Sequence, residues 1–389
     1  MDIIQHSMLK KLAASKGNSM ISLFIPTSRM TPTMEQNMIR FKNETRKAQA
    51  MLRKMGLGKP ETEALLAPLE RLLDDTFFWR KQSDGLAVYR SPDMFEYFRL
   101  PYASGEETVI MNRFLVTPLM KYYTAYGRFF ILSLSQNSVR LYQATPYTIN
   151  EVDIENAPGN IAEALRWDDP ERQFQYHTGT AAQVAGKRAA VYHGQGVGTD
   201  DSVHKVNLLR YFQKIDRGLH GLLNERHLPL VLAGVEYLLP IYREANTYPY
   251  LIDDEIYGNP DERSDQQLLR EALPAVTAHF ADEMKHAAAI ITELAHTNRT
   301  STDIKKILPA AIQGTVETLM IDPDARLWGR YDDENGKCTV YDSHESGTEE
   351  LINRTAIHAL LHGCTVHSAS RDDIPKGASL AAIFRYSAP

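Results

Sequence analysis

Hydrophobic positions at the start of the chain form one unbroken run and then a stripe at helical spacing. The run, residues 19–26, ends in a proline and is typical of a short buried strand. Apolar residues then recur at helical intervals of three, four or seven positions from Met34 to Met55, after a Thr33–Gln36 pair with capping-box spacing, and two glycines close the stripe. The pattern predicts a strand followed by a long helix.

Two further patterns complete this part of the chain. Leucines between positions 65 and 73 repeat at helical spacing and predict a second helix. The apolar segments 85–89 and 95–100 flank a Ser-Pro-Asp turn signal and predict a hairpin. We therefore expect a first α/β domain over residues 1–126.

The pattern changes after Arg128, where three strand-like segments follow one another closely. Their connections are short, which predicts an antiparallel meander over residues 129–154. A helix is predicted over about 203–225, with apolar residues from Val206 to Leu222 facing inward. The apolar run 229–235 then has the composition of a buried strand reached by a crossover helix. These elements predict a central domain over residues 127–261.

The last third of the chain mixes helices with five short strands. Helical patterns dominate residues 264–297, and a further helix is predicted over 349–361. Strands are predicted at 315–321, 327–331, 338–341, 364–369 and 380–386. We expect a third domain over residues 262–389 and a mixed α/β (α+β) fold, because 389 residues exceed one ordinary core.

Composition narrows the class of protein. Hydrophobic residues make up 43% and charged residues 24% of the chain, the balance of a folded globular protein. The first residues lack the pattern of a signal peptide, and apolar stretches such as 228–235 are too short to span a bilayer. Two cysteines suit a reducing compartment. The sequence predicts a cytoplasmic protein without a membrane segment.

Charge is unevenly distributed. The net charge of −6 argues against a simple basic DNA- or RNA-binding protein. Between Arg29 and Lys59, however, there are eight basic residues and two acidic ones. Taken alone, such a run is more often a solvated helix face than a binding surface.

Three features in a fixed order carry the most information about function. A loop with interrupting glycines contains His193-Gly194-Gln195, a helix with basic residues on its polar side follows, and a strand then ends in Leu-Ala-Gly at position 234. This order resembles the central domain of the archaeo-eukaryotic class-one peptide release factors and of Pelota. Further phrases resemble the bacterial branch of that superfamily: 82–88, 237–243, 246–249 and 380–386.

The resemblance implies a three-domain architecture with a ribonuclease-H-like central domain and an α/β/α C-terminal domain. It also implies binding at the A site of the 70S ribosome, since the bacterial branch includes Balon-type hibernation factors, which accompany elongation factor Tu. No cofactor, metal or DNA partner is implied. The expected contacts to 16S and 23S rRNA come from Arg40, Arg46, Lys47, Arg53, Lys54, Lys187, Arg188, His193, Gly194, Gln195, Gly196, Lys205 and Arg210.

Two departures from the family pattern separate binding from catalysis. His193 stands where the release factors have the first glycine of a Gly-Gly-Gln tip, and its side chain restricts the backbone. An Asn-Ile-Lys-Ser stop-codon motif is absent. We therefore predict a non-enzymatic hibernation factor. The alternative is a codon-independent peptidyl-tRNA hydrolase that rescues stalled ribosomes, with Gln195 positioning water through its side-chain amide.

Other chemistries receive less support. Gly194, Gly196 and Gly198 do not have the spacing of a dinucleotide or triphosphate loop, which leaves a nucleotide-binding enzyme as a third reading. A metal site is not predicted, although four candidate ligands lie close together in sequence: His358, His362, Cys364 and His367. The acidic residues at 168–169 and 253–255 lie among loop signals and are expected to be solvated carboxylates.

Overall fold

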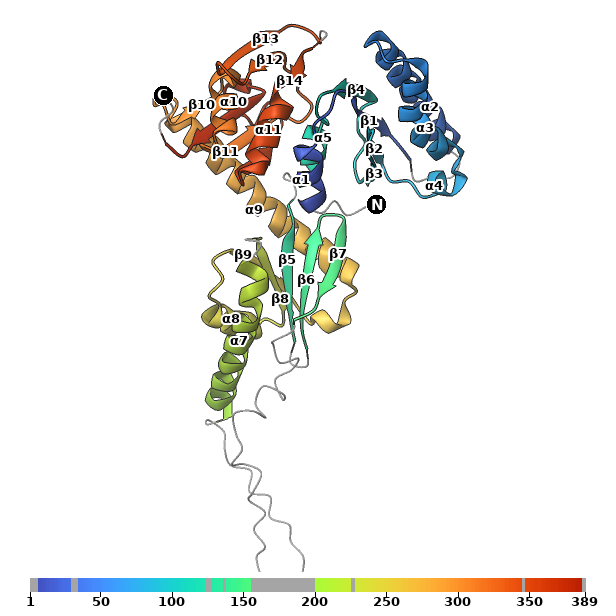
Figure 1. Cartoon of the computed structure of the whole chain (residues 1–389). Coiled ribbons are helices and arrows are strands. Elements are labelled where there is room, and N and C mark those ends of the chain that lie inside the picture. The colour runs from blue at the N-terminus through green and yellow to red at the C-terminus, as the bar shows by residue number, and fades with distance from the viewer. Residues whose placement is uncertain are drawn as a thin grey trace, which may run out of the picture. The chain divides into compact units, whose positions relative to one another are not determined.

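The computed structural model describes residues 6–28, 34–123, 127–135, 138–154, 200–224, 228–344 and 347–386 (Figure 1). The chain divides into two compact units. One combines Met1–Tyr126 with Phe280–Pro389, and the other is Gly127–His279. Both contain helices and sheets, which confirms the mixed α/β class. The division into domains at 126/127 and 261/262 stays a prediction.

The N-terminal part of the first unit is built on a four-stranded antiparallel sheet in the order β3-β2-β1-β4. Its strands are β1 Met20–Pro26, β2 Gly85–Ser91, β3 Met94–Leu100 and β4 Glu107–Met111. The predicted strand at 19–26 and the predicted hairpin are confirmed. Strand β4, which the sequence pattern did not reveal, pairs along β1 as an edge strand.

Successive side chains of β1 point to opposite faces of the sheet, and both faces are buried. Ile21, Leu23 and Ile25 pack against α2 Met34–Lys54 and α3 Lys59–Asp74, the two helices that the sequence predicted. Met20 and Phe24 pack in a second core, which also contains residues of α1 His6–Ala14 and α5 Thr117–Tyr123. A short helix, α4 Thr76–Arg80, follows α3.

The C-terminal part of this unit has three layers. Its main sheet has the order β10-β16-β11-β15, with β15 parallel to β11 and β16 antiparallel to it. Leu319 and Ile321 of β11 pack with α10 and α11, whereas Met320 packs with the end of α9. The predicted α/β/α layering is confirmed. The bounds are α9 Asp265–Glu293, β10 Thr300–Ser301, α10 Ile304–Ile312, β11 Val316–Ile321, α11 Leu351–Leu361, β15 Thr365–Ser368 and β16 Leu380–Phe384.

A second, smaller sheet in this part has the order β13-β12-β14. It is formed by β12 Trp328–Asp332, β13 Lys337–Tyr341 and β14 Glu349–Glu350. All five strands predicted after residue 300 are confirmed, as is the helix near 349–361. Helix α10 was missed, and the helices expected at 264–297 are one continuous helix, α9.

The unit Gly127–His279 is built on a five-stranded sheet in the order β7-β6-β5-β8-β9. Strands β5, β6 and β7 form the predicted antiparallel meander, and β8 returns parallel to β5 after α7, as a crossover requires. Strand β9 adds parallel to β8. This order is that of a ribonuclease-H-like sheet. The bounds are β5 Phe129–Leu134, β6 Val139–Thr145, β7 Thr148–Val152, α7 Asp200–Asn224, β8 Leu230–Gly234, α8 Leu238–Ala245 and β9 Leu251–Tyr257.

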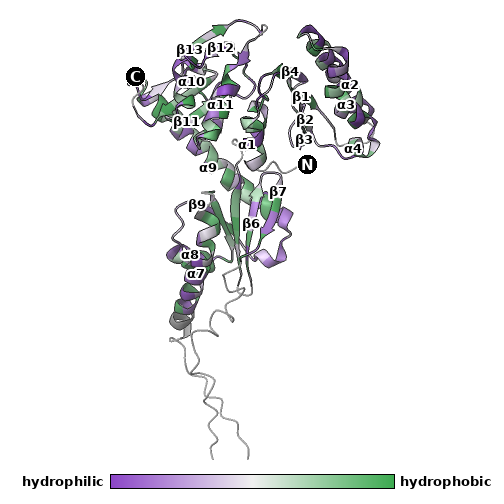
Figure 2. Ribbon diagram, viewed as in Figure 1, coloured by the Kyte–Doolittle hydropathy of each residue, from purple (hydrophilic) through white to green (hydrophobic). Residues whose placement is uncertain are grey.

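Two details of this unit correct the sequence interpretation. Val206 of α7 is 48% exposed, because the buried stripe runs through Leu208, Phe212 and Ile215, and a residue two positions before Leu208 points elsewhere. Residues 253–255 lie in strand β9 rather than in a loop, and Arg243 pairs with Asp253 and Glu255. A strand at a sheet edge tolerates such charges. Figure 2 shows the contrast between the apolar β5 and β8 and the mixed surface of α7.

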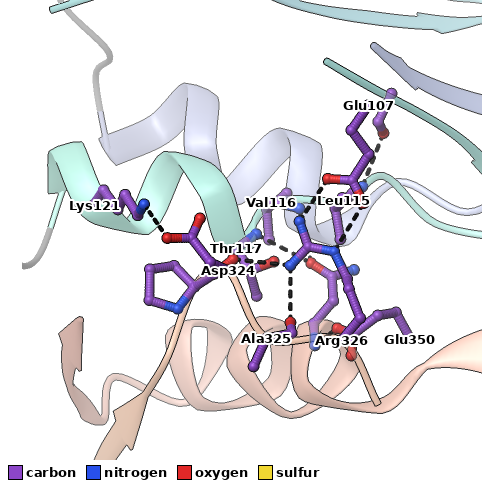
Figure 3. A network of polar contacts seen from close by, with 12 residues as sticks. Glu107, Leu115, Val116, Thr117, Lys121, Asp324, Ala325, Arg326 and Glu350 are labelled. Atoms are coloured by element: carbon purple, nitrogen blue, oxygen red, sulfur yellow. Dashed lines mark hydrogen bonds and ion pairs between the residues drawn. The ribbon is translucent and has the colours of Figure 1, made fainter. Parts of the chain in front are cut away.

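A polar seam joins the two sequence segments of the first unit (Figure 3). Arg326 donates to both carboxylate oxygens of Glu107, at 2.9 and 2.6 Å. The buried Asn353 accepts from the backbone N–H of Val116 at 2.7 Å and donates to the carbonyl of Phe114 at 2.8 Å. These partners are more than 200 residues apart, so the seam fixes the first segment to the last.

Candidate nucleic-acid interface

Helix α2 carries the densest group of exposed cations among the predicted contact residues. Phe41, Ala48 and Leu52 are buried on one side, and this apolar stripe holds the helix on the sheet. Lys42, Arg46 and Arg53 recur at spacings of four and seven residues and are exposed on another side. Because these spacings return to one face of a helix, the three cations form a row of about 16 Å. Lys47 and Lys54 are also exposed.

Two of the predicted contact residues on α2 are already paired. The guanidinium of Arg40 lies 3.2 Å from Glu106 and also donates to the carbonyl of Pro26 at 3.3 Å. Lys47 donates to Glu44, whose side chain is fully buried, and this hydrogen bond raises the pKa of Lys47. Arg40 therefore ties the helix to residues outside it, whereas Lys47 neutralises the buried carboxylate of Glu44 within the same helix.

Glu44 anchors α2 to the sheet. Its second carboxylate oxygen accepts a hydrogen bond from the Thr108 hydroxyl of β4 at 2.7 Å. Among the described residues, by contrast, Lys42, Arg46, Arg53 and Lys54 form no ion pair. The helix thus separates its anchored cations from four cations that are available to a partner. Lys42 was part of the basic run but was not among the predicted contact residues.

The turn between α2 and α3 presents the end of this row. Gly56 has φ +91°, and its N–H donates to the carbonyl of Arg53. The N–H of Leu57 donates to the carbonyl of Leu52. This is a Schellman C-cap, which needs a glycine at the left-handed position and confirms the predicted helix end. Met55, predicted to belong to the apolar stripe, is 49% exposed because the helix has already ended at Lys54.

Helix α7 carries the second described group of predicted contacts. Lys205 and Arg210 are both exposed, and Lys205 forms an ion pair of 3.6 Å with Glu244 of α8. The helix is tied to the loop before β9 by Asp216, which is 4% exposed and accepts from the N–H and hydroxyl of Thr247. Its cations therefore lie on a helix with a fixed position on the central sheet.

Within the described residues, the structure shows neither a metal site nor a membrane-spanning helix. Those residues include no group of three or more His, Cys, Asp or Glu side chains that is able to hold a metal ion. The Cys364 thiol donates to the carbonyl of Val316 at 3.0 Å, and burial raises its pKa. Of the helices that the structure describes, none combines the length and the apolar composition that a bilayer span requires.

The comparison with protein families decides the identity of the central sheet. Residues 129–278 match the family model described as bacterial archaeo-eukaryotic release factor family 7. The match begins at the first residue of β5 and includes the whole ribonuclease-H-like sheet. The central region is thus similar in sequence to this release-factor family. The resemblance noted in the sequence is thereby confirmed.

Solved structures of the superfamily also align with the chain. An archaeal translation termination factor, aRF1, is 14% identical over 98% of this chain and 99% of its own, with a TM-score of 0.23. Ribosome-bound archaeal Pelota, in a structure with ABCE1, is 10% identical over 76% of this chain and 73% of its own, with a TM-score of 0.38. Dom34 of S. cerevisiae is 11% identical over 78% of this chain and 80% of its own, with a TM-score of 0.37. At these scores the likenesses carry no argument about function. A comparison with curated protein sequences gave no match.

The Leu-Ala-Gly end of β8 has a structural reason in this release-factor domain. A Cβ added at Gly234 would lie 2.8 Å from the carbonyl oxygen of Leu134 and 2.9 Å from the side chain of Leu239. The glycine therefore allows the parallel strands β5 and β8 and helix α8 to approach closely. This part of the sequence signature serves the packing of the domain.

The predicted tip of the release-factor domain lies outside the described residues. This applies to Lys187, Arg188, His193, Gly194, Gln195 and Gly196. Their roles stay predictions, as do the RNA contacts assigned to α2 and α7. The structure brings Arg46, Arg53 and Lys54 together on one helix, with Lys42 added, and places Lys205 and Arg210 on another.

Proposed function

We propose that the chain is a ribosome-binding translation factor of the cytoplasm that occupies the A site of the 70S ribosome and silences and protects ribosomes in hibernation. Two observations support the proposal. The central region is similar in sequence to a release-factor family, and α2 presents four exposed cations that no described residue neutralises. The second observation carries the argument for RNA as the partner.

The charge distribution fits a localised RNA contact. The chain as a whole carries −6, so a general attraction to polyanions is absent. Lys42, Arg46, Arg53 and Lys54 nevertheless form a compact positive surface on a helix that Glu44 and Thr108 tie to the sheet. Because the helix is held in place, these cations can meet phosphates without the cost of ordering the backbone that carries them. Ribosomal RNA supplies phosphates in a rigid arrangement.

Charge reversal tests this surface. The triple variant Arg46→Glu, Arg53→Glu, Lys54→Glu is expected to lose at least tenfold in affinity for purified 70S ribosomes, measured by co-sedimentation between 50 and 200 mM salt. The salt dependence is also expected to weaken, by about 0.7 to 0.9 in slope for each phosphate that the variant no longer neutralises. A matched control reverses three exposed lysines of the C-terminal part, Lys305, Lys306 and Lys337. Equal losses in both variants would contradict the proposed surface.

The second candidate function is a codon-independent peptidyl-tRNA hydrolase that rescues stalled ribosomes. The sequence His193-Gly194-Gln195 favours it, because a glutamine side chain offers a donor and an acceptor for water. Release of labelled peptide from peptidyl-tRNA on 70S ribosomes distinguishes the two functions. For the hibernation factor we expect no release above background and unchanged ribosome binding by Gln195→Ala. Release that Gln195→Ala abolishes would establish the hydrolase instead.

Elongation factor Tu is the proposed protein partner. The expectation comes from the resemblance to Balon-type factors, and the C-terminal α/β/α part is the candidate contact. Co-purification with elongation factor Tu in its GTP and GDP forms, on and off the ribosome, measures this directly. Failure to associate in every form would remove this partner and leave the RNA surface unaffected.

A further inference from the structure

A second positive cluster lies in the first unit, away from the exposed face of α2. It gathers where α1, the segment after β4 and α11 pack in one core, to which Leu12, Phe114 and Ile357 belong. Its members come from three places in the sequence. Lys16 follows α1, and Arg113 follows β4. Helix α11 contributes Arg354 and His358, four residues apart on one face, and His362 is the C-cap residue that follows the helix.

Arg354 is neutralised within the protein. It donates to Glu349 at 2.5 Å, forms an ion pair with Asp333, and its guanidinium lies 4.9 Å from the centre of the Tyr331 ring. The same two carboxylates also act on Arg113 through their charge, so an anion that binds Arg113 competes with them.

Arg113 is the unusual member. Its side chain is only 8% exposed, yet it forms no hydrogen bond or ion pair with any residue that the structure describes. A guanidinium removed from water without a partner is costly, so such an arrangement calls for an anion. Lys16 is exposed and likewise unpaired within the described part of the chain.

His358 adds an unused polar atom to the same place. Its Nε2 atom is buried and has no hydrogen-bond partner among the described residues. Its ring lies 6.3 Å from that of His362, and the carbonyl of His358 contacts Nδ1 of His362 at 2.9 Å. Burial is the main cause that lowers the pKa of His358 to about 4, and the charges of Arg113, Arg354, His362 and Lys16 act in the same direction. Arg113, Arg354 and Lys16 thus place three cations near one buried ring, and the two nearby carboxylates form hydrogen bonds with Arg354.

We propose that Arg113, Lys16 and the Nε2 edge of His358 form a binding site for a phosphate group. A planar guanidinium matches two phosphate oxygens, and a lysine adds a point charge. The neutral imidazole donates one hydrogen bond from Nε2. Either inorganic phosphate or the phosphodiester of RNA can supply this group. The site goes beyond the proposed function, because none of its residues belongs to the α2 surface.

The competing acceptor for Arg113 is internal. The second carboxylate oxygen of Glu349 is buried and has no partner among the described residues. If Arg113 reaches this oxygen in solution, its charge is neutralised and phosphate is not bound. An experiment must therefore observe the cluster itself.

NMR of the histidine ring protons in the full-length protein follows His358 while inorganic phosphate or a short single-stranded RNA is added. A bound phosphate offsets the neighbouring positive charges, so the pKa of His358 is expected to rise by about half a unit or more. Lys16→Ala is expected to weaken binding by roughly three- to tenfold, and Arg113→Met to abolish both binding and the pKa change. Lys10→Ala, an exposed lysine of α1, is the matched control.

The outcomes show whether the site binds a phosphate group and whether that group comes from the free ion or from RNA. Saturation by inorganic phosphate supports a site for the free ion. A response to RNA alone, sensitive to Lys16→Ala, supports the phosphodiester. The proposal is overturned if neither probe moves the His358 titration, or if Lys16→Ala and Lys10→Ala have the same effect. Because Lys16 is exposed, this comparison holds even if Arg113→Met fails to fold.

Discussion

The α2 surface and the polar seam of the first unit use charge in opposite ways. On α2, four cations are exposed and no described residue neutralises them. In the seam, Arg326, Glu350 and Asn353 direct nearly every polar atom to a partner in the chain. Exposed charges contribute little to stability and remain available for binding, whereas buried polar groups are costly to leave unpaired. Substitutions in the two regions should therefore affect different measurements.

The largest effect on stability is expected for Asn353→Ala. The substitution removes one acceptor and one donor, leaving the backbone N–H groups of Val116 and Thr117 and the carbonyl of Phe114 buried without partners. At about 1–3 kcal/mol for each unsatisfied group, with some relaxation, the free energy of unfolding should fall by roughly 3–5 kcal/mol. Urea unfolding measures it. Asn335→Ala, at an exposed turn, should change stability by less than about 0.5 kcal/mol, and a similar loss there would contradict the role of the seam.

The seam should also impose a pH dependence. Burial raises the pKa of Glu350 to about 7, against hydrogen bonds from Leu327 and Asn353 and the charge of Arg326, which lower it. The folded state therefore holds this proton more tightly than the unfolded state. Its stabilising contribution is complete below the unfolded pKa of 4.5 and is lost as the pH rises through about 7.

His358 has the opposite sign, because its folded pKa of about 4 lies below the ordinary value of 6.5. Its contribution is lost as the pH falls through that interval, so the two groups oppose each other between about pH 4.5 and 6.5. Glu350→Gln keeps the shape and removes one side of this balance. The variant should gain stability relative to wild type as the pH rises from 5 to 7, by at most about 1.4 kcal/mol per pH unit. If the free energies of unfolding of the two proteins change in parallel with pH, the pKa of Glu350 is not raised in the folded state.

A smaller loss of stability is expected for Lys47→Met. Among the residues that the structure describes, the substitution leaves the buried carboxylate of Glu44 with only the Thr108 hydroxyl as a side-chain partner. Because Lys47 is 59% exposed, solvent already weakens the ion pair, and the expected cost is about 1 kcal/mol. Lys42→Met is the matched control on the same helix and should leave stability within about 0.5 kcal/mol. If both variants lose the same amount, neutralisation of Glu44 by Lys47 does not stabilise the fold.

The smallest effect on stability should come from Arg53→Ala, on the exposed row. Its removal should change the free energy of unfolding by less than about 0.5 kcal/mol, yet reduce the salt slope of ribosome binding by about 0.7 to 0.9. Arg53→Lys, which keeps the charge, should retain the slope. A loss of stability without a change in slope would place Arg53 with the structural residues instead.

The sequence by itself determined most local elements of this protein. The run at 19–26, the hairpin, the meander of β5 to β7 and the return of β8 parallel to β5 follow from period-two and helical patterns and from turn residues. The Leu-Ala-Gly signature at Gly234 was also visible in the sequence. The family match then confirmed the relation that this order of motifs indicated.

The sequence pattern failed where burial is incomplete or the partner is distant. Strand β4 is a partly exposed edge, and β9 carries three consecutive acidic residues, so neither shows the apolar signal of a buried strand. Pairings such as Glu107–Arg326, Asn353–Val116 and Arg40–Glu106 leave no periodic trace. Local periodicity records which side of an element is buried. Which cations are neutralised depends on segments that only the folded chain brings together, and this decided that Arg40 pairs with Glu106 while Arg46 and Arg53 remain available.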